Sequence, residues 1–147
     1  NNGLAIDVRY QTMDGRLLDP TNITQGTDLM AVVTIQHNGV RGWYQNLALT
    51  QVFPSGWEIR NSRLEGTEEA ASNSAFSYQD IRDDRVMTYF NLRAGEQATY
   101  RIFLNAAYVG RYYLPASICE AMYDHTVNAR DRGRWVNVNR PGGASAP

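Results

Sequence analysis

Apolar and polar residues alternate along much of this chain, and this alternation restricts the fold more than any other feature of the sequence. Residues 4–10 carry apolar or aromatic side chains at every even-numbered position, and residues 97–106 repeat the pattern with Tyr100, Ile102 and Leu104 on one face. Successive side chains of a β-strand point to opposite sides of a sheet, so a period of two is typical of a half-buried strand. The sequence therefore predicts an all-β fold.

Short turn-forming segments divide the alternating stretches into about eight predicted strands, a number and spacing typical of an antiparallel two-sheet β-sandwich. Glycine supplies the backbone freedom that tight turns need at Asp14-Gly15 and at Pro54-Ser55-Gly56. Pro115 falls inside the predicted strand 111–123 and indicates an edge strand or a bulge, because proline cannot donate a ladder hydrogen bond. The side chains that we expect to be buried are Ile6, Val8, Val33, Ile35, Leu47, Leu49, Ile102 and Leu104.

The alternation stops between residues 66 and 84. Glu68-Glu69-Ala70-Ala71 is acidic and rich in alanine, which favours a short helix, and Ser72-Asn73-Ser74 would end it. We therefore predict a long insertion around 66–84 that is helical in part. The domain is expected to span residues 1–140, and the Gly- and Pro-containing segment 141–147 is expected to be a disordered tail.

The composition excludes several classes of function. The chain has 147 residues, which suits one domain, and a formal net charge of −1, which gives no general attraction to nucleic acid or to an anionic membrane. All 14 basic residues are arginines, and they are scattered along the chain. No apolar run is long enough to predict a transmembrane helix.

The sequence contains no recognisable catalytic or metal-binding pattern. His37 and His125 are the only histidines, and we interpret each as a solvated residue in a turn or polar loop. Cys119 is the only cysteine, and its apolar surroundings indicate a small buried side chain and not a nucleophile. The acidic group Asp80, Asp83 and Asp84 lacks the spacing of a calcium loop, which favours local pairing with Arg82 and Arg85. We predict that the chain is not an enzyme and uses no metal and no cofactor.

Four segments in a fixed order resemble one family. These segments are Gly3–Tyr10 with the following Asp14-Gly15 and residues 23–29; Phe53-Pro-Ser-Gly-Trp-Glu-Ile59; Asp83-Asp-Arg-Val86 leading to Phe90; and Gly110–Ala116 running into Glu120-Ala-Met-Tyr123. The resemblance that they indicate spans residues 3 to about 138, nearly the whole chain. The chain resembles the C-terminal macroglobulin-like domain of bacterial alpha-2-macroglobulins, the counterpart of the receptor-binding domain of animal macroglobulins.

The resemblance implies a function that belongs to a longer protein. Members of the family are protease-trapping inhibitors of the periplasm, usually anchored to the inner membrane as lipoproteins. The implied partners are the other domains of the same chain, above all a thioester-type domain, and target proteases through the full-length inhibitor. Cys119-Glu-Ala-Met122 departs from the family's Cys-x-Glu-Gln thioester motif because it lacks the glutamine, so Cys119 is not the reactive cysteine.

Glu120, Met122 and Tyr123 are the candidate residues for contact between domains. They end the predicted strand 111–123, next to an expected polar loop at 124–133. A flexible thioether beside an amphipathic ring suits a surface that excludes water from a neighbouring thioester. The alternative is that Met122 points into the core of this domain, as half of all strand positions do.

A different class of function is also compatible with the sequence. Trp43, Tyr44 and Trp57 are aromatic side chains that could stack on sugar rings in a carbohydrate-binding or adhesion β-sandwich of another exported bacterial protein. The competing interpretation is that Trp57 belongs to the core and that Trp43 and Tyr44 pack at a sheet edge.

Overall fold

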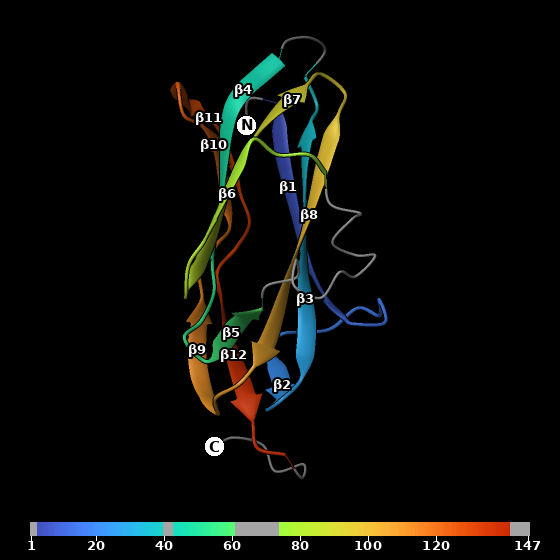
Figure 1. Cartoon of the computed structure of the whole chain (residues 1–147), viewed down its shortest axis with the longest axis vertical. Coiled ribbons are helices and arrows are strands. Elements are labelled where there is room, and N and C mark those ends of the chain that lie inside the picture. Colours follow the sequence, from blue (N-terminus) through green and yellow to red (C-terminus); the bar gives the residue numbers. More distant parts are fainter. Residues whose placement is uncertain (1–2, 40–42, 61–73, 142–147) are drawn as a thin grey trace.

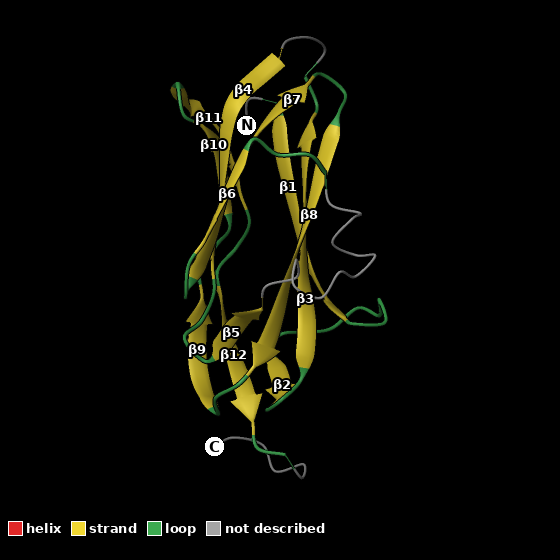
Figure 2. Ribbon diagram, viewed as in Figure 1, coloured by secondary structure: helices red, strands yellow, loops and turns green. Residues whose placement is uncertain are grey.

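A computed structural model of the chain describes residues 3–39, 43–60 and 74–141. These residues form β-strands, turns and loops and contain no helix (Figure 2). The strands are β1 (Leu4–Thr12), β2 (Asn22–Thr24), β3 (Asp28–His37), β4 (Trp43–Val52), β5 (Trp57–Arg60), β6 (Tyr78–Ile81), β7 (Arg85–Arg93), β8 (Gln97–Ala106), β9 (Gly110–Leu114), β10 (Ile118–Ala121), β11 (Asp124–Arg130) and β12 (Arg134–Asn139). The predicted all-β sandwich is confirmed.

The strands form two large sheets and one small one. The order is β1-β3-β8-β5 in the first sheet, β11-β10-β4-β7-β6 in the second and β2-β12-β9 in the third. All strand pairs are antiparallel except β2 with β12, which is parallel. The two large sheets lie on opposite sides of an elongated molecule, and the small sheet lies at its lower end, near the C-terminus (Figure 1).

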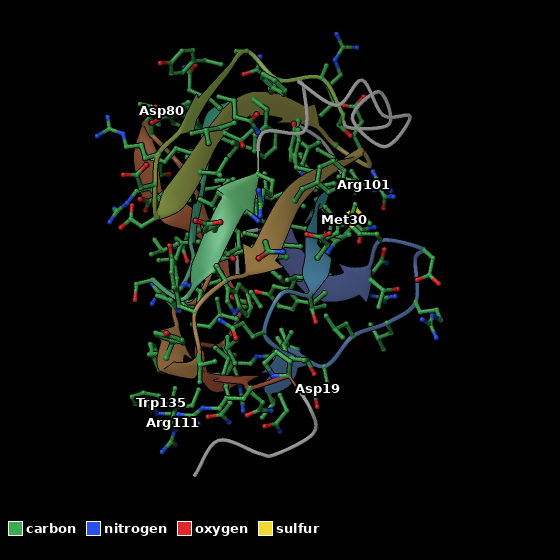
Figure 3. All side chains as sticks on the ribbon, turned by 60° about the horizontal axis from the view of Figure 1, so that its bottom comes forward. Asp19, Met30, Asp80, Arg101, Arg111 and Trp135 are labelled. Atoms are coloured by element: carbon green, nitrogen blue, oxygen red, sulfur yellow. The ribbon has the colours of Figure 1, made fainter. Side chains whose placement is uncertain are left out.

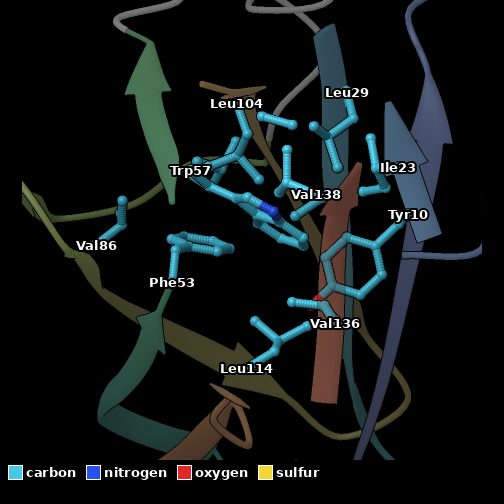
Figure 4. Close-up of a cluster of buried hydrophobic side chains, with 13 residues drawn as sticks. Tyr10, Ile23, Leu29, Phe53, Trp57, Val86, Leu104, Leu114, Val136 and Val138 are labelled. Atoms are coloured by element: carbon cyan, nitrogen blue, oxygen red, sulfur yellow. The ribbon is translucent and has the colours of Figure 1, made fainter. Parts of the chain in front are cut away.

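The inward-facing side chains form two main clusters along the sandwich. The upper cluster contains Leu4, Val33, Ile35, Leu47, Leu49, Phe90, Leu92, Ala98, Tyr100, Cys119, Ala121 and Val127. The lower cluster, shown in Figure 4, contains Tyr10, Ile23, Leu29, Ala31, Phe53, Trp57, Val86, Ile102, Leu104, Ala106, Leu114, Val136 and Val138. Six of the eight residues that we expected in the core are buried, and Ile6 and Val8 are partly buried. These two lie on β1, an edge strand of its sheet, so fewer neighbours cover them.

The predicted strand 111–123 is in fact two strands in different sheets. β9 ends at Leu114, Pro115 interrupts the pairing, and β10 begins at Ile118 in the five-stranded sheet. Pro115 thus lies between the strands and not within one; β9 is the edge strand of the small sheet, whereas β10 lies between β11 and β4. The segment between the two strands is fixed by Asp131, which accepts a hydrogen bond from the Ser117 backbone N–H.

The prediction of a part-helical insertion falls largely on residues 61–73, outside the described residues. Within the described segment 74–84 there is no helix. That segment contains β6, which pairs with β7 as the edge strand of the five-stranded sheet. Most of the expected tail, residues 142–147, also lies outside the described residues.

The Pro54-Ser55-Gly56 turn directs Trp57 into the lower cluster. The backbone N–H of Trp57 donates to the Pro54 carbonyl over 3.0 Å, and Trp57 is 2% exposed. The ring of Tyr112 lies so close to Gly56 that a Cβ at that position would overlap it. Glycine is required there by this close approach of the ring.

Candidate functional site

Met122 and Tyr123 form the tip of a β-hairpin. Ala121 of β10 pairs with Asp124 of β11, so the two residues between them make a two-residue turn. Both side chains are 58% exposed. Met122 therefore does not point into the core of this domain, which removes that alternative.

The backbone of this turn is held against the neighbouring strand β4. Met122 N–H donates to the carbonyl of Asn46 over 3.0 Å. Asn46 itself has a positive φ of 57° at a register shift in β4, and its N–H donates to Asn91 Oδ1 over 2.9 Å. Asparagine tolerates this conformation better than most residues. The turn is thus anchored through its main chain while its side chains face outward.

The sequence missed the second strand of the hairpin. Residues 124–133 were expected to be a polar loop, but Asp124–Arg130 form β11, whose register with β10 shifts between Glu120 and Ala121. The turn lacks the glycine or asparagine that marks most two-residue hairpins. This is why Met122 and Tyr123 were interpreted as the end of a strand.

Glu120 lies on the outer face of β10, beside this turn. Its neighbours Cys119 and Ala121 are fully buried in the upper cluster, and successive side chains of a strand alternate in direction. Glu120 is half-buried and lies opposite Ala48 of β4 and Asn128 of β11. The structure therefore brings the three predicted contact residues together at one end of the five-stranded sheet.

The cysteine has no catalytic environment. Cys119 is completely buried, and desolvation, with a smaller effect from the Glu120 charge, raises the pKa of its thiol to about 12. The thiol is therefore protonated at neutral pH and is a poor nucleophile. No group of three His, Cys, Asp or Glu side chains that could hold a metal ion occurs in residues 3–39, 43–60 and 74–141.

The histidine interpretations need correction. His37 was expected to be a solvated turn residue, but it ends β3 and is 1% exposed. Its Nδ1 accepts a hydrogen bond of 3.0 Å from the Gly39 N–H. The backbone of His125 belongs to β11 and not to a polar loop, while its side chain lies outside the described part of the structure.

The predicted pairing of the acidic group with arginines is confirmed for two of its members. Arg82 Nε lies 3.0 Å from Asp80 Oδ2, and a guanidinium nitrogen of Arg85 lies 3.1 Å from Asp84 Oδ2. The hydrogen bond from Arg85 lowers the pKa of Asp84. These carboxylates are compensated by neighbouring arginines on and next to β6 and β7.

Of the three aromatic residues proposed for sugar stacking, the structure describes the side chain of Trp57 alone. Trp57 is buried, so that part of the carbohydrate hypothesis is wrong, and the side chains of Trp43 and Tyr44 lie outside the described residues. A different pair of aromatic residues is exposed, Tyr113 on β9 and Trp135 on β12. The sequence carried a signal for Trp135, since it alternates with the buried Val136 and so must point the other way.

No helix in the described part of the chain is long and apolar enough to cross a membrane.

Comparison with known proteins places the chain in one family. The model of the bacterial alpha-2-macroglobulin MG10 domain matches residues 3–125. The alpha-2-macroglobulin of Xylella fastidiosa (strain Temecula1) is 28% identical over 136 residues, covering 82% of this chain and 8% of that protein. Circularly permutated Ras protein 2 of Dictyostelium discoideum is 29% identical over 120 residues, covering 80% of this chain and 3% of that protein.

Solved structures show the same fold. The native conformation of Escherichia coli alpha-2-macroglobulin matches with a TM-score of 0.81 at 17% identity, covering 94% of this chain and 9% of that one. The trypsin-activated form of the same protein matches with a TM-score of 0.80 at 18% identity, covering 96% and 10%. The chain thus spans about a tenth or less of these relatives. Because the family model matches well over half of its length, the chain belongs to the bacterial alpha-2-macroglobulin MG10 domain family.

Proposed function

We propose that this chain is the C-terminal interaction domain of a bacterial alpha-2-macroglobulin that traps proteases. In this proposal its Met122–Tyr123 turn packs on a neighbouring thioester-type domain and keeps water from it. The observation that carries the proposal is the exposure of both side chains, 58% each, on a turn whose backbone is anchored to β4. The membership of the chain in the MG10 family supports the identity of the longer protein.

The chemistry of the turn suits a water-excluding contact. The thioether of Met122 adapts to an irregular surface, and the ring of Tyr123 is apolar on its faces and polar at its hydroxyl. Burying one such side chain against a partner stabilises the contact by about 1.5–3 kcal/mol. Because the turn is held in place before binding, little of that free energy is spent on ordering it. Glu120, on the outer face just behind the turn, would lie at the rim of the contact.

The domain contributes no reactive group of its own in this proposal. Cys119 is buried and protonated, so a thioester would have to come from another domain of the inhibitor.

We expect the longer protein to reside in the periplasm, anchored to the inner membrane as a lipoprotein, on the strength of the family alone. We also expect this chain by itself not to inhibit any protease. Stoichiometric inhibition by these 147 residues would contradict the assignment.

The test uses the full-length inhibitor carrying Met122→Ala and Tyr123→Ala together. The rate at which methylamine releases a free thiol from the uncleaved protein is compared with that of the wild type. We expect the rate to rise about tenfold or more, since each 1.4 kcal/mol lost from the closed contact exposes the bond ten times more often. Tyr78→Ala, which removes an exposed tyrosine from β6, is the matched control and should leave the rate unchanged. Equal rates in the double variant and the wild type would refute a shielding role.

A further inference from the structure

The small sheet carries an aromatic and cationic surface that the proposed function does not use. Tyr113 of β9 lies directly opposite Trp135 of β12, and their rings meet edge to face with centroids 5.4 Å apart. The guanidinium carbon of Arg111 lies 4.7 Å from the centre of the Trp135 ring. Tyr113 is 51% and Trp135 53% exposed. We name Arg111, Tyr113 and Trp135 the lower patch.

The lower patch is built into the fold and is not a chance meeting of mobile side chains. All three residues lie on paired strands, and the guanidinium of Arg111 lies over the indole ring in a cation–π contact. The hydroxyl end of Tyr113 lies against the backbone of Gly133, where any side chain larger than hydrogen would overlap it. The groups are therefore arranged before any partner arrives, which lowers the cost of ordering them on binding.

The charge around the lower patch is not compensated as it is elsewhere on the molecule. The arginines at positions 9, 16, 60, 82 and 85 each form an ion pair with a nearby carboxylate. Among the described residues, Arg111 and Arg132 form no ion pair. Arg132 belongs to the surroundings of the lower patch because it directly precedes Gly133, which contacts Tyr113. The nearby Asp131 is half-buried and accepts a hydrogen bond from the Ser117 N–H, so it is directed inward. These two exposed arginines therefore leave positive charge without an ion pair beside the aromatic rings, although the whole chain has a net charge of −1.

We propose that the lower patch is a docking surface for an acidic polypeptide surface. Tryptophan, tyrosine and arginine are the residues that most often contribute a large share of the binding free energy at protein–protein interfaces. The positive charge of the arginines is complementary to carboxylates on a partner. The matched relatives are more than ten times longer than this chain, so most of the protein in which such a domain occurs is polypeptide that could supply the acidic surface. A sugar is a poorer fit, because Arg111 covers a face of Trp135 on which a sugar ring would stack.

The lower patch lies far from the Met122–Tyr123 turn. The small sheet is at the lower end of the molecule, whereas the tip of the β10–β11 hairpin is at the upper end (Figure 1). Figure 3 brings the lower end forward and shows Arg111 and Trp135 together at its margin. The two surfaces could therefore be occupied at the same time, and the proposal for the lower patch does not depend on the shielding role of the turn.

In the experiment, this chain is titrated with a glutamate–tyrosine copolymer, and binding is measured by isothermal titration calorimetry. We expect saturable binding that weakens as salt is raised. Trp135→Ala should weaken it about tenfold or more, as the loss of a central interface tryptophan does. Arg111→Lys keeps the charge but loses the planar stacking group, so it should weaken binding by a smaller factor. Tyr78→Ala, an exposed tyrosine on another sheet, is the control and should bind like the wild type.

Several results would overturn the proposal. These are an absence of binding, an equal loss in Tyr78→Ala, and tighter binding of polygalacturonate through the same residues, which would indicate an anionic glycan. Self-association of the chain that Trp135→Ala abolishes would indicate a second copy as the occupant. Thermal unfolding of each variant verifies that it is folded; if Trp135→Ala is not, the Arg111→Lys result decides.

Discussion

The two ends of the sandwich both expose large side chains, but they support them differently. At the upper end Met122 and Tyr123 lie on a turn beyond the last pair of the β10–β11 ladder. At the lower end Tyr113 and Trp135 lie opposite each other inside a ladder and contact each other through their rings. A cross-strand aromatic pair contributes about 0.2–1 kcal/mol to its own sheet, whereas an exposed side chain beyond the end of a ladder has no position opposite it on a paired strand to supply that contribution. Exposure alone therefore does not show what a residue does for the domain.

The hydrophobic clusters beneath the two ends also differ, in the number of sheets that contribute side chains to them. The upper cluster is enclosed by the two large sheets, with Phe90 and Tyr100 as its aromatic pair at 5.3 Å between centroids. The lower cluster receives side chains from all three sheets and contains Tyr10, Phe53 and Trp57. We therefore expect the lower end to respond most strongly to truncation.

The largest effect is expected for Trp57→Ala. Trp57 is 2% exposed and its ring lies 5.9 Å from Tyr10 and 6.4 Å from Phe53. Removing a buried tryptophan side chain costs about 3–5 kcal/mol of unfolding free energy, which urea denaturation measures. Trp57→Phe should cost less, because the indole N–H has no hydrogen-bond partner among the described residues. Equal losses in the two variants would show that the N–H is bonded in solution.

A gain in stability is expected between the two clusters. Gln51 lies on the inner face of β4 and is 1% exposed. It lies between Leu49 of the upper cluster and Phe53 of the lower cluster, which directly follows the strand. Neither end of its amide has a hydrogen-bond partner among the described residues. A buried polar group without a partner costs about 1–3 kcal/mol, so Gln51→Met, of similar volume, should raise the free energy of unfolding. Gln51→Ala is the control, since it leaves a cavity and should not; a lower stability in Gln51→Met would mean that an internal water satisfies the amide.

A pH-dependent effect is expected at the lower end. Burial raises the pKa of Asp131 above its ordinary value, although the Ser117 N–H and Arg134 oppose the shift. The folded state then holds the proton more tightly than the unfolded state. The contribution of Asp131 is therefore fully present below the unfolded pKa of about 3.9 and is lost as pH rises through the higher folded value. The difference in unfolding free energy between the wild type and Asp131→Asn should change in this window and be flat above it; a flat difference throughout would contradict the shift.

The smallest effect is expected at the turn. Met122→Ala and Tyr123→Ala should each change the stability of this chain by less than about 0.5 kcal/mol, as surface substitutions usually do. Ile102→Ala is the core reference and should cost about 2–5 kcal/mol. Trp135→Ala should fall between them, because it breaks a cross-strand pair. A loss at Met122 as large as at Ile102 would make Met122 a core residue and remove the basis of the shielding proposal.

The inner faces of the sandwich could be predicted because alternation carries that information directly. It was strong enough to identify Val33, Ile35, Leu47 and Leu49 as buried residues. His37 shares the parity of Val33 and Ile35, and it was missed because it was interpreted as a turn residue and not as the last residue of the strand.

The partners of the strands could not be predicted in the same way. Alternation does not say which strand lies beside which, so the change of sheet at Pro115 was read as one long strand. β2 has three residues, too few for any periodic signal. The candidate contact residues were found through a resemblance, and their exposure could be learned only from the pairing of β10 with β11.

The parallel pairing of β2 with β12 also has a consequence for the order of events during synthesis. It joins Asn22–Thr24 to Asn137–Asn139, positions more than a hundred residues apart in the chain. During translation β2 leaves the ribosome long before β12. The lower cluster, which contains Ile23, Phe53 and Trp57, therefore remains incomplete until Val136 and Val138 have emerged. Folds that depend on such distant pairings form slowly and expose apolar surface meanwhile. We therefore expect nascent chains that stop before β12 to be sensitive to proteases, and the domain to become resistant in a single late step.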